Sequence, residues 1–240
     1  SVIQLLLGNY ENGLKNYEFR FKKREPPILH GNPIISKIDS LNLQIGKKIL
    51  VVSEQGLGDT LQYMRYIPYL RYQGFDIEFC TEKKLHTLIK ASKIHPNPLT
   101  PDQTNLVKDG TWISLLSLPK YLKVNPKNPI VTAPYIFSIN TLRKKWKKIL
   151  SLEKKKIVGI NWQGNPKAEK SNQKGRSFPL ENFSKIAGNS NLKFLSLQKG
   201  YGSEQLEHCT FKNQFVDCQS KVDSCWDFLE NVLQADVRPE

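Results

Sequence analysis

The chain has 240 residues, 39% hydrophobic and 10% aromatic, enough to bury the core of one large domain or two modest ones. It carries 36 Lys and Arg against 22 Asp and Glu, a net charge of +14. Such a charge suits a lysine-coated solvated surface, a polyanion-binding surface or a cleft for a phosphorylated substrate. No apolar run approaches the roughly 20 residues of a membrane-spanning helix. Composition therefore excludes a wholly disordered chain and a bundle of membrane-spanning helices.

The spacing of the cysteines indicates the redox compartment of the protein, and the first residues indicate how much of the protein the chain represents. The four cysteines form no Cys-x-x-Cys pair and do not cluster with the four histidines. This spacing predicts neither a zinc site nor a disulfide framework, so a reducing cytoplasm is expected. The chain begins at Ser1 within an apolar stretch, and we interpret it as a piece of a longer or processed protein.

Residues 1–25 are predicted to be helical, with a break at Gly8-Asn9. Apolar and aromatic side chains then recur at helical spacing, at Tyr10, Leu14, Tyr17 and Phe21. The pattern Leu7-Gly8-x-Tyr10 resembles part of a tetratricopeptide repeat, a unit that needs neighbours to bury its apolar face. The segment is either the end of such an array, with a surface for a protein partner, or a plain helical hairpin.

A polar connection over 26–46 leads into alternating strands and helices. Residues 48–53 form an apolar, β-branched run that is typical of a buried parallel strand. A helix is predicted over 59–72, a second strand over 76–80 and a second helix over 82–91. This order is typical of an open α/β sheet.

The second half of the chain repeats the same alternation after a proline-rich connector. Residues 139–150 are predicted to form a basic amphipathic helix, which either bridges two domains or lies on an anionic membrane. The other predicted elements are a loop over 96–110, a short apolar element over 114–119, strands over 155–162 and 192–197, and a helix over 180–188.

The glycine turn after the first strand is the strongest candidate for chemistry. Gly56 and Gly58 are expected to turn the backbone tightly and let it approach a ligand. Asp59 then falls in the first turn of the helix, where it is either a cap or a cap that also serves as a general base. Gln62 and Tyr66 are expected on the same helical face and would line an acceptor pocket.

Several spaced motifs resemble one family. EQGLGDTLQYMRYIPYL at 54–70 resembles the first nucleotide-fold turn of bacterial glycosyltransferases in which tetratricopeptide repeats precede a two-domain GT-B region. These enzymes are related to the lipopolysaccharide heptosyltransferases. Further stretches match in order over roughly residues 1–230: LLLGNYENGLKNYEFRF at 5–21, LLSLP at 115–119, VGINWQGNP at 158–166, RSFPL at 176–180 and SLQKG at 196–200.

The resemblance implies an inverting sugar transfer from a nucleotide-sugar to a hydroxyl of a glycan, lipid or protein, without a cofactor or an essential metal. Asp59 would be the base, and Gly58, Gln62 and Tyr66 would bind the acceptor. Arg176 would contact the donor phosphate, a role that also suits a guanidinium ahead of a helix N-terminus. Lys199, Asn165 and Gln163 lie on matching loops and are the other donor-binding candidates.

The expected fold is therefore α/β, a GT-B-like pair of Rossmann-type parallel-sheet domains. The expected parts are a repeat end over 1–25, an acceptor domain over 26–138, a linker helix over 139–152 and a donor domain over 153–240. The donor domain is predicted to be incomplete, because the chain stops before the turn that cradles the donor diphosphate in the family.

Two functions stay open at this point. The chain is a glycosyltransferase, or it is a non-catalytic, repeat-type protein-binding scaffold with a degenerate transferase domain. Its lysines match no nucleic-acid-binding motif, so no specific nucleic acid partner is expected. The expected location is the cytoplasm, with a peripheral position at the inner membrane as a further possibility.

Overall fold

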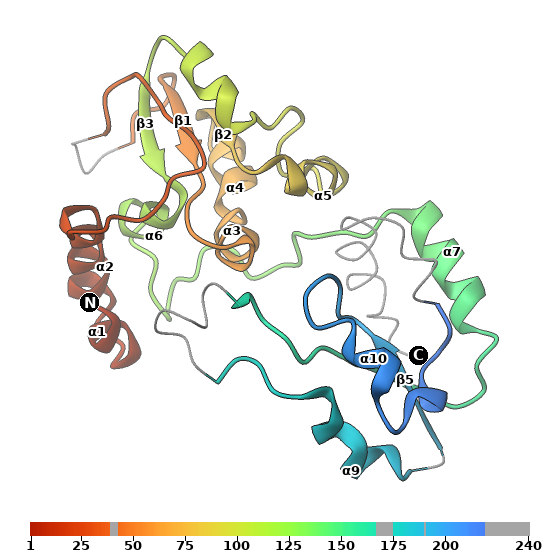
Figure 1. The fold of residues 1–240 in the computed structure, drawn as a ribbon. Coiled ribbons are helices and arrows are strands. Elements are labelled where there is room, and N and C mark those ends of the chain that lie inside the picture. Colours follow the sequence, from red (N-terminus) through yellow and green to blue (C-terminus); the bar gives the residue numbers. More distant parts are fainter. Residues whose placement is uncertain (39–42, 167–174, 190, 219–240) are drawn as a thin grey trace. The chain divides into compact units, whose positions relative to one another are not determined.

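The computed structural model describes residues 1–38, 43–166, 175–189 and 191–218 of this chain (Figure 1). The chain forms two compact units, Ser1–Phe137 and a second that starts at Ser138. Each contains a small parallel sheet with helices in its connections, which confirms the α/β class.

The sheet of the first unit has three parallel strands. Strand β1 (Lys48–Val52) lies between β2 (Asp76–Cys80) and β3 (Thr111–Ser114), as Figure 1 shows. All residues of β1 except Lys48 are buried, because both edges of the strand are paired and its apolar run faces protein on both sides. The predicted strands at 48–53 and 76–80 are confirmed, whereas β3 was not predicted.

The connection after β1 contains two short helices instead of the single predicted helix. Helix α3 (Leu57–Tyr63) ends before α4 (Tyr66–Tyr72) begins. Pro68 has no N–H to donate to the carbonyl of Met64, which instead accepts a tighter hydrogen bond from Ile67 at 3.0 Å. The prediction of one helix over 59–72 was wrong for this reason.

The N-terminal helical segment packs as a hairpin followed by a tight helix. It comprises α1 (Val2–Leu6), α2 (Tyr10–Tyr17) and the 3₁₀ helix η1 (Glu18–Lys22). The predicted break is confirmed at Gly8, and Asn9 caps α2 by accepting from the backbone N–H of Asn12. A Cβ at Gly13 would lie 2.7 Å from the Leu5 side chain, so glycine allows the two helices to pack closely.

The remaining elements of the first unit connect its strands. Helix α5 (His86–Ala91) follows β2 through the 3₁₀ turn η2 (Lys83–Leu85) and confirms the helix predicted at 82–91. The stretch predicted as loop contains the 3₁₀ helix η3 (Pro101–Leu106). The apolar element predicted at 114–119 is the 3₁₀ turn η4 (Leu115–Ser117) and α6 (Leu118–Tyr121).

The second unit contains helix α7 (Asn140–Leu150), then parallel strands β4 (Lys156–Ile160) and β5 (Leu192–Ser196). Between the strands lie η5 (Leu180–Phe183) and α9 (Ser184–Ala187), and α10 (Gln205–His208) and η6 (Lys212–Gln214) follow. The predicted helices and strands of this half are confirmed. A buried cluster contains Ile160, Trp162, Leu180, Ala187, Phe194 and Phe211.

Candidate functional site

The turn after β1 has a backbone that differs from the predicted one. The left-handed conformation belongs to Gln55, with φ +64°, while Gly56 is extended with φ −90° and ψ 165°. A non-glycine residue in this region costs about 1–3 kcal/mol and persists only where its surroundings hold it. The Gln55 Nε2 donates a hydrogen bond to the Tyr17 hydroxyl at 2.9 Å, so the N-terminal segment supports this turn.

Asp59 lies in the first turn of α3, beyond the carboxyl end of the central strand. Its Oδ2 accepts a hydrogen bond from the backbone N–H of Gly56 at 3.0 Å, so its role as a cap is confirmed. No other hydrogen bond to this carboxylate is found in the part of the chain that the structure describes. The side chain is partly exposed, which leaves Oδ1 available to an incoming hydroxyl.

The other predicted acceptor residues divide between two environments. Gly58 and Gln62 are exposed on α3 beside Asp59, and a Cβ at Gly58 would meet nothing within 4 Å. Tyr66 belongs to α4 and is only 7% exposed, with its ring centroid 6.5 Å from that of Tyr63. The structure therefore groups Gly58, Asp59 and Gln62 on one helix and places Tyr66 beneath the surface, while its acceptor role stays a prediction.

A buried ion pair lies directly beneath the turn. Glu54, fully buried, binds Arg20, which is 5% exposed: Oε1 lies 2.6 Å from one terminal guanidinium nitrogen and Oε2 lies 3.3 Å from Nε. Ser114 donates a hydrogen bond to the same carboxylate. The pair connects the N-terminal segment to the carboxyl end of β1, and sequence reasoning missed it.

The Arg20 guanidinium also has other hydrogen-bond partners and contacts an aromatic ring. Its guanidinium also donates to the Glu18 carboxylate at 2.8 Å and to the Ser117 hydroxyl at 2.9 Å. It stacks on the Tyr17 ring, with 4.3 Å from Cζ to the ring centroid. Burial alone would lower the pKa of Arg20, but its hydrogen bonds and ion pairs with Glu54 and Glu18 raise it instead. The guanidinium is thus permanently charged and fixed.

Two phenols lie within electrostatic range of Asp59. The pKa values of Tyr17 and Tyr63 are both raised, chiefly by burial, and the charge of Asp59 adds to each shift. Both side chains are therefore neutral hydrogen-bonding groups at physiological pH. Neither was a predicted site residue, although both belong to motifs of the sequence.

A cavity of about 340 Å³ lies near the break between α3 and α4. Arg65 lines it and lies 4.8 Å from the ring centroid of Tyr135, whose hydroxyl donates to the Leu61 carbonyl at 2.7 Å. The Arg65 Nε donates to the Gln62 carbonyl at 2.7 Å. Arg65 thus connects this cavity to the backbone of Gln62, a predicted acceptor residue, and is the cation among the described residues that line it.

In the second unit, one buried amide organises the loops after both strands. The Gln198 Oε1 accepts hydrogen bonds from Asn161 Nδ2 at 3.0 Å, from Trp162 N at 3.3 Å and from Gln163 N at 2.9 Å. Its Nε2 donates to the Tyr201 carbonyl at 2.7 Å. Sequence reasoning selected the neighbours of Gln198 but not Gln198 itself.

The predicted donor residues lie on the loops that these bonds connect. Gln163 and Asn165 follow β4 and Lys199 follows β5, while Arg176 lies on an exposed loop held by the Ser177 hydroxyl, which accepts from Gly164 N at 2.9 Å. Gly202, with φ +92°, packs against Gln163 so closely that a Cβ would lie 2.6 Å from that of Gln163. The structure places all four candidates at the carboxyl end of this sheet, and their donor role stays a prediction.

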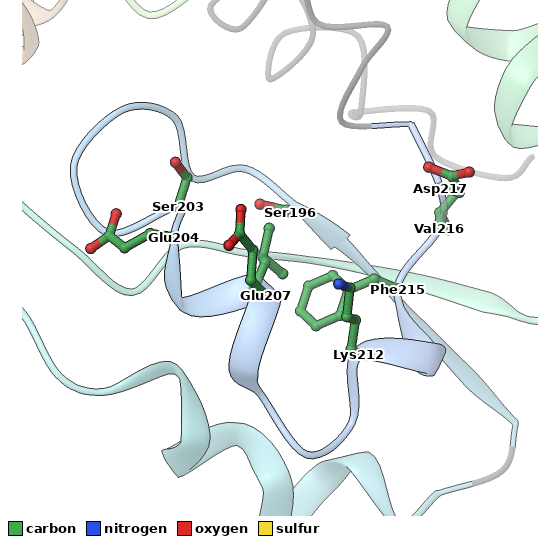
Figure 2. A pocket seen from close by; sticks show the side chains of 9 residues that line it. Ser196, Ser203, Glu204, Glu207, Lys212, Phe215, Val216 and Asp217 are labelled. Carbon is green, nitrogen blue, oxygen red and sulfur yellow. The ribbon is translucent and has the colours of Figure 1, made fainter.

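A larger cavity of about 490 Å³ lies elsewhere in this unit, between the end of β5, α10 and the segment around η6 (Figure 2). None of the four predicted donor residues lines it. Among the described residues that line it, Glu204, Glu207 and Asp217 contribute three carboxylates against the one cation of Lys212. Such a lining disfavours a nucleoside diphosphate, because its phosphates would meet like charge.

The described residues also bear on metal binding, thiol chemistry and membrane crossing. No group of three or more His, Cys, Asp or Glu side chains there could hold a metal ion. Cys80 and Cys209 are free thiols, and burial raises the pKa of Cys80 to about 12. Of the helices in the described ranges, none is long and apolar enough to cross a membrane.

No family model, no curated protein and no solved structure matches this chain.

Proposed function

We propose that this chain is a glycosyltransferase that transfers a sugar, with inversion, from a nucleotide-sugar donor to a hydroxyl acceptor. The observation that carries the proposal is the state of Asp59: a partly exposed carboxylate beyond the central strand, which among the described residues is held through its Oδ2 alone. In open α/β sheets, ligands bind beyond the carboxyl ends of the strands. A carboxylate fixed there can accept a proton in the reaction.

On the acceptor side, Gln62 and the backbone at Gly58 would contact the glycan, lipid or protein that supplies the hydroxyl. The open space at Gly58 supports this role, because an incoming group could approach the helix there. Tyr66 would act from beneath by supporting the surface. The neutral phenols of Tyr17 and Tyr63 extend the same surface.

On the donor side, Arg176 and Lys199 would neutralise the phosphates of the nucleotide-sugar, and Asn165 and Gln163 would fix its orientation. Their loops follow the carboxyl ends of β4 and β5 and are tied through Gln198 and Ser177. Neutralisation of the phosphates by side chains lets the reaction run without an essential metal.

In the proposed reaction the acceptor oxygen attacks the anomeric carbon from the face opposite the leaving phosphate. The new oxygen–carbon bond forms as the carbon–oxygen bond to the phosphate breaks. The hydroxyl proton passes to Asp59, and the negative charge leaves with the nucleotide.

Two variants at one position separate capping from catalysis. Asp59→Asn keeps an oxygen that can accept from Gly56 N–H but removes the base, whereas Asp59→Ala removes both. We expect Asp59→Asn to preserve the melting temperature and to abolish release of nucleotide from its sugar donor. Unchanged release in Asp59→Asn would leave the residue as a cap alone.

Donor binding is tested separately by thermal-shift titration with UDP, GDP, ADP and CMP, since a ligand that binds the folded state raises the melting temperature. A shift with one nucleotide that Arg176→Ala removes supports the donor role. Arg24→Ala is the matched control, because Arg24 is an exposed arginine of the first unit. No shift with any nucleotide would contradict donor binding.

The second candidate, a protein-binding scaffold, rests on the uncovered apolar side chains of the N-terminal hairpin. Ile3, Leu6 and Leu7 are 72%, 81% and 79% exposed. A partner helix that covered them would bury a sizeable apolar area. This function predicts that Leu6→Glu with Leu7→Glu lowers self-association or partner binding in sedimentation experiments, while Asp59→Asn has no effect.

We also propose a cytoplasmic location with peripheral association at the inner membrane. The basic segment at 143–156 of the second unit supports the association with the membrane.

A further inference from the structure

The positive charge of the chain is concentrated in one short segment of the second unit. Residues 143–156 carry eight basic side chains and one acidic one, Glu153, which leaves +7 of the total +14. The eight are Arg143, Lys144, Lys145, Lys147, Lys148, Lys154, Lys155 and Lys156. All eight are exposed, and none forms an ion pair with an acidic side chain within the described residues.

Helix α7 presents Lys144, Lys145, Lys147 and Lys148 away from the core because its other side is packed. Trp146 is 3% exposed and clusters with Leu195 and Cys218, and Ile149 and Leu150 pack against the same cluster. A helix turns about 100° per residue, so Lys144 and Lys148, two positions either side of Trp146, point roughly away from the core. Lys145 and Lys147 flank them, whereas Arg143, three positions before Trp146, lies nearer the packed side, where its guanidinium donates to the Ser138 hydroxyl at 2.6 Å.

The surface around this segment suits lipid headgroups better than nucleic acid. Binding to single-stranded nucleic acid combines cations with exposed aromatic rings on which bases stack, but the aromatic residue of α7, Trp146, is buried. The residue exposed beside the cations is instead aliphatic: Leu152 is 80% exposed in the turn after the helix. Exposed cations with an adjacent apolar side chain are typical of proteins that lie on anionic bilayers.

We propose that the exposed face of α7, with Leu152 and the lysines at 154–156, docks on the surface of a bilayer that contains anionic lipids. The cations contact headgroup phosphates, and Leu152 enters the interfacial layer. The helix has 11 residues, too short to span, so it lies on the surface. The inference concerns lipid binding alone and holds whether or not the chain transfers sugar.

Sedimentation of the full chain with vesicles tests this surface. We expect binding to vesicles of phosphatidylglycerol mixed with phosphatidylcholine, weakening with added salt, and no binding to phosphatidylcholine alone. A basic side chain near an anionic bilayer contributes roughly fivefold to the partition coefficient. Replacement of Lys144 and Lys148 by Gln should therefore lower it by roughly 30-fold.

Two further variants make the test specific. Lys47→Gln with Lys127→Gln removes the same charge from exposed sites of the first unit and should leave binding within about twofold. Leu152→Ser should weaken binding without changing its salt dependence, because it removes only the apolar contact. Thermal melting checks that each variant is folded.

Three results would overturn the proposal. The first is no binding to phosphatidylglycerol vesicles, and the second is an equal loss in the Lys47/Lys127 control. The third is displacement of the chain from these vesicles by a single-stranded RNA oligonucleotide whose total phosphate concentration is lower than that of the anionic lipid. That last result would assign the surface to nucleic acid instead.

Discussion

Replacing Arg20 by Met should destabilise the first unit severely. The substitution roughly preserves the volume of the side chain but leaves the Glu54 carboxylate fully buried, with Ser114 as its remaining neighbour in the network. Removing one partner of a buried ion pair costs about 3–5 kcal/mol, because the other charge is left without compensation. The free energy of unfolding should therefore fall by about that amount.

A double-mutant cycle isolates the contribution of the Arg20–Glu54 pair to the free energy of unfolding. Unfolding in urea is monitored by circular dichroism. Arg20→Met with Glu54→Met removes both charges and should recover most of the loss, since an apolar pair of similar volume can replace a buried ion pair. Lys48→Met is the control: it breaks the exposed pair of Lys48 with Asp109 and should change stability little. If Arg20→Met costs no more than this control, or if the double variant recovers nothing, the reasoning is refuted.

Three further outcomes are expected. Gly58→Ala should keep the unfolding midpoint, because a Cβ there meets nothing within 4 Å, but lower nucleotide release at least tenfold if the acceptor approaches α3 at this point. Gly202→Ala should lower the melting temperature of the second unit, since φ is +92° and the new Cβ meets Gln163; a midpoint like that of the wild type would contradict this. Burial lowers the pKa of His95, whose Nε2 lies 2.9 Å from the Ile77 carbonyl. The folded state thus favours neutral imidazole, so its stabilising contribution is complete above pH about 6.5 and is lost as the pH falls toward the lower folded-state pKa. His95→Gln should flatten this loss in melts recorded against pH.

Strands β1, β2, β4 and β5 were predictable because each combines Ile, Val, Leu or Phe side chains within five residues that have clear boundaries in the sequence. Strand β3 was missed because its two apolar residues, Trp112 and Ile113, merge with the apolar turn that follows. The break between α3 and α4 had a local signal in Pro68, and the helical spacing of apolar residues concealed it.

The site was predictable only where its signals are local. Asp59 stands three residues after Gly56, and that spacing alone predicts the observed cap. The pairing of Arg20 with Glu54 spans 34 positions, and the bonds from Gln198 to the loop after β4 span 35 to 37. No periodicity or motif encodes such distant pairs, because they depend on how the strands align.

The Gln198 amide also determines how the second unit opens. The backbone N–H groups of Trp162 and Gln163 both donate to the Gln198 Oε1. One rotation of the Gln198 side chain away from the sheet would therefore expose both N–H groups to solvent. Their hydrogen–deuterium exchange should therefore proceed at a shared rate, set by a single opening event. A ligand bound to either loop would slow exchange on the other, since neither loop can detach while Gln198 stays in place.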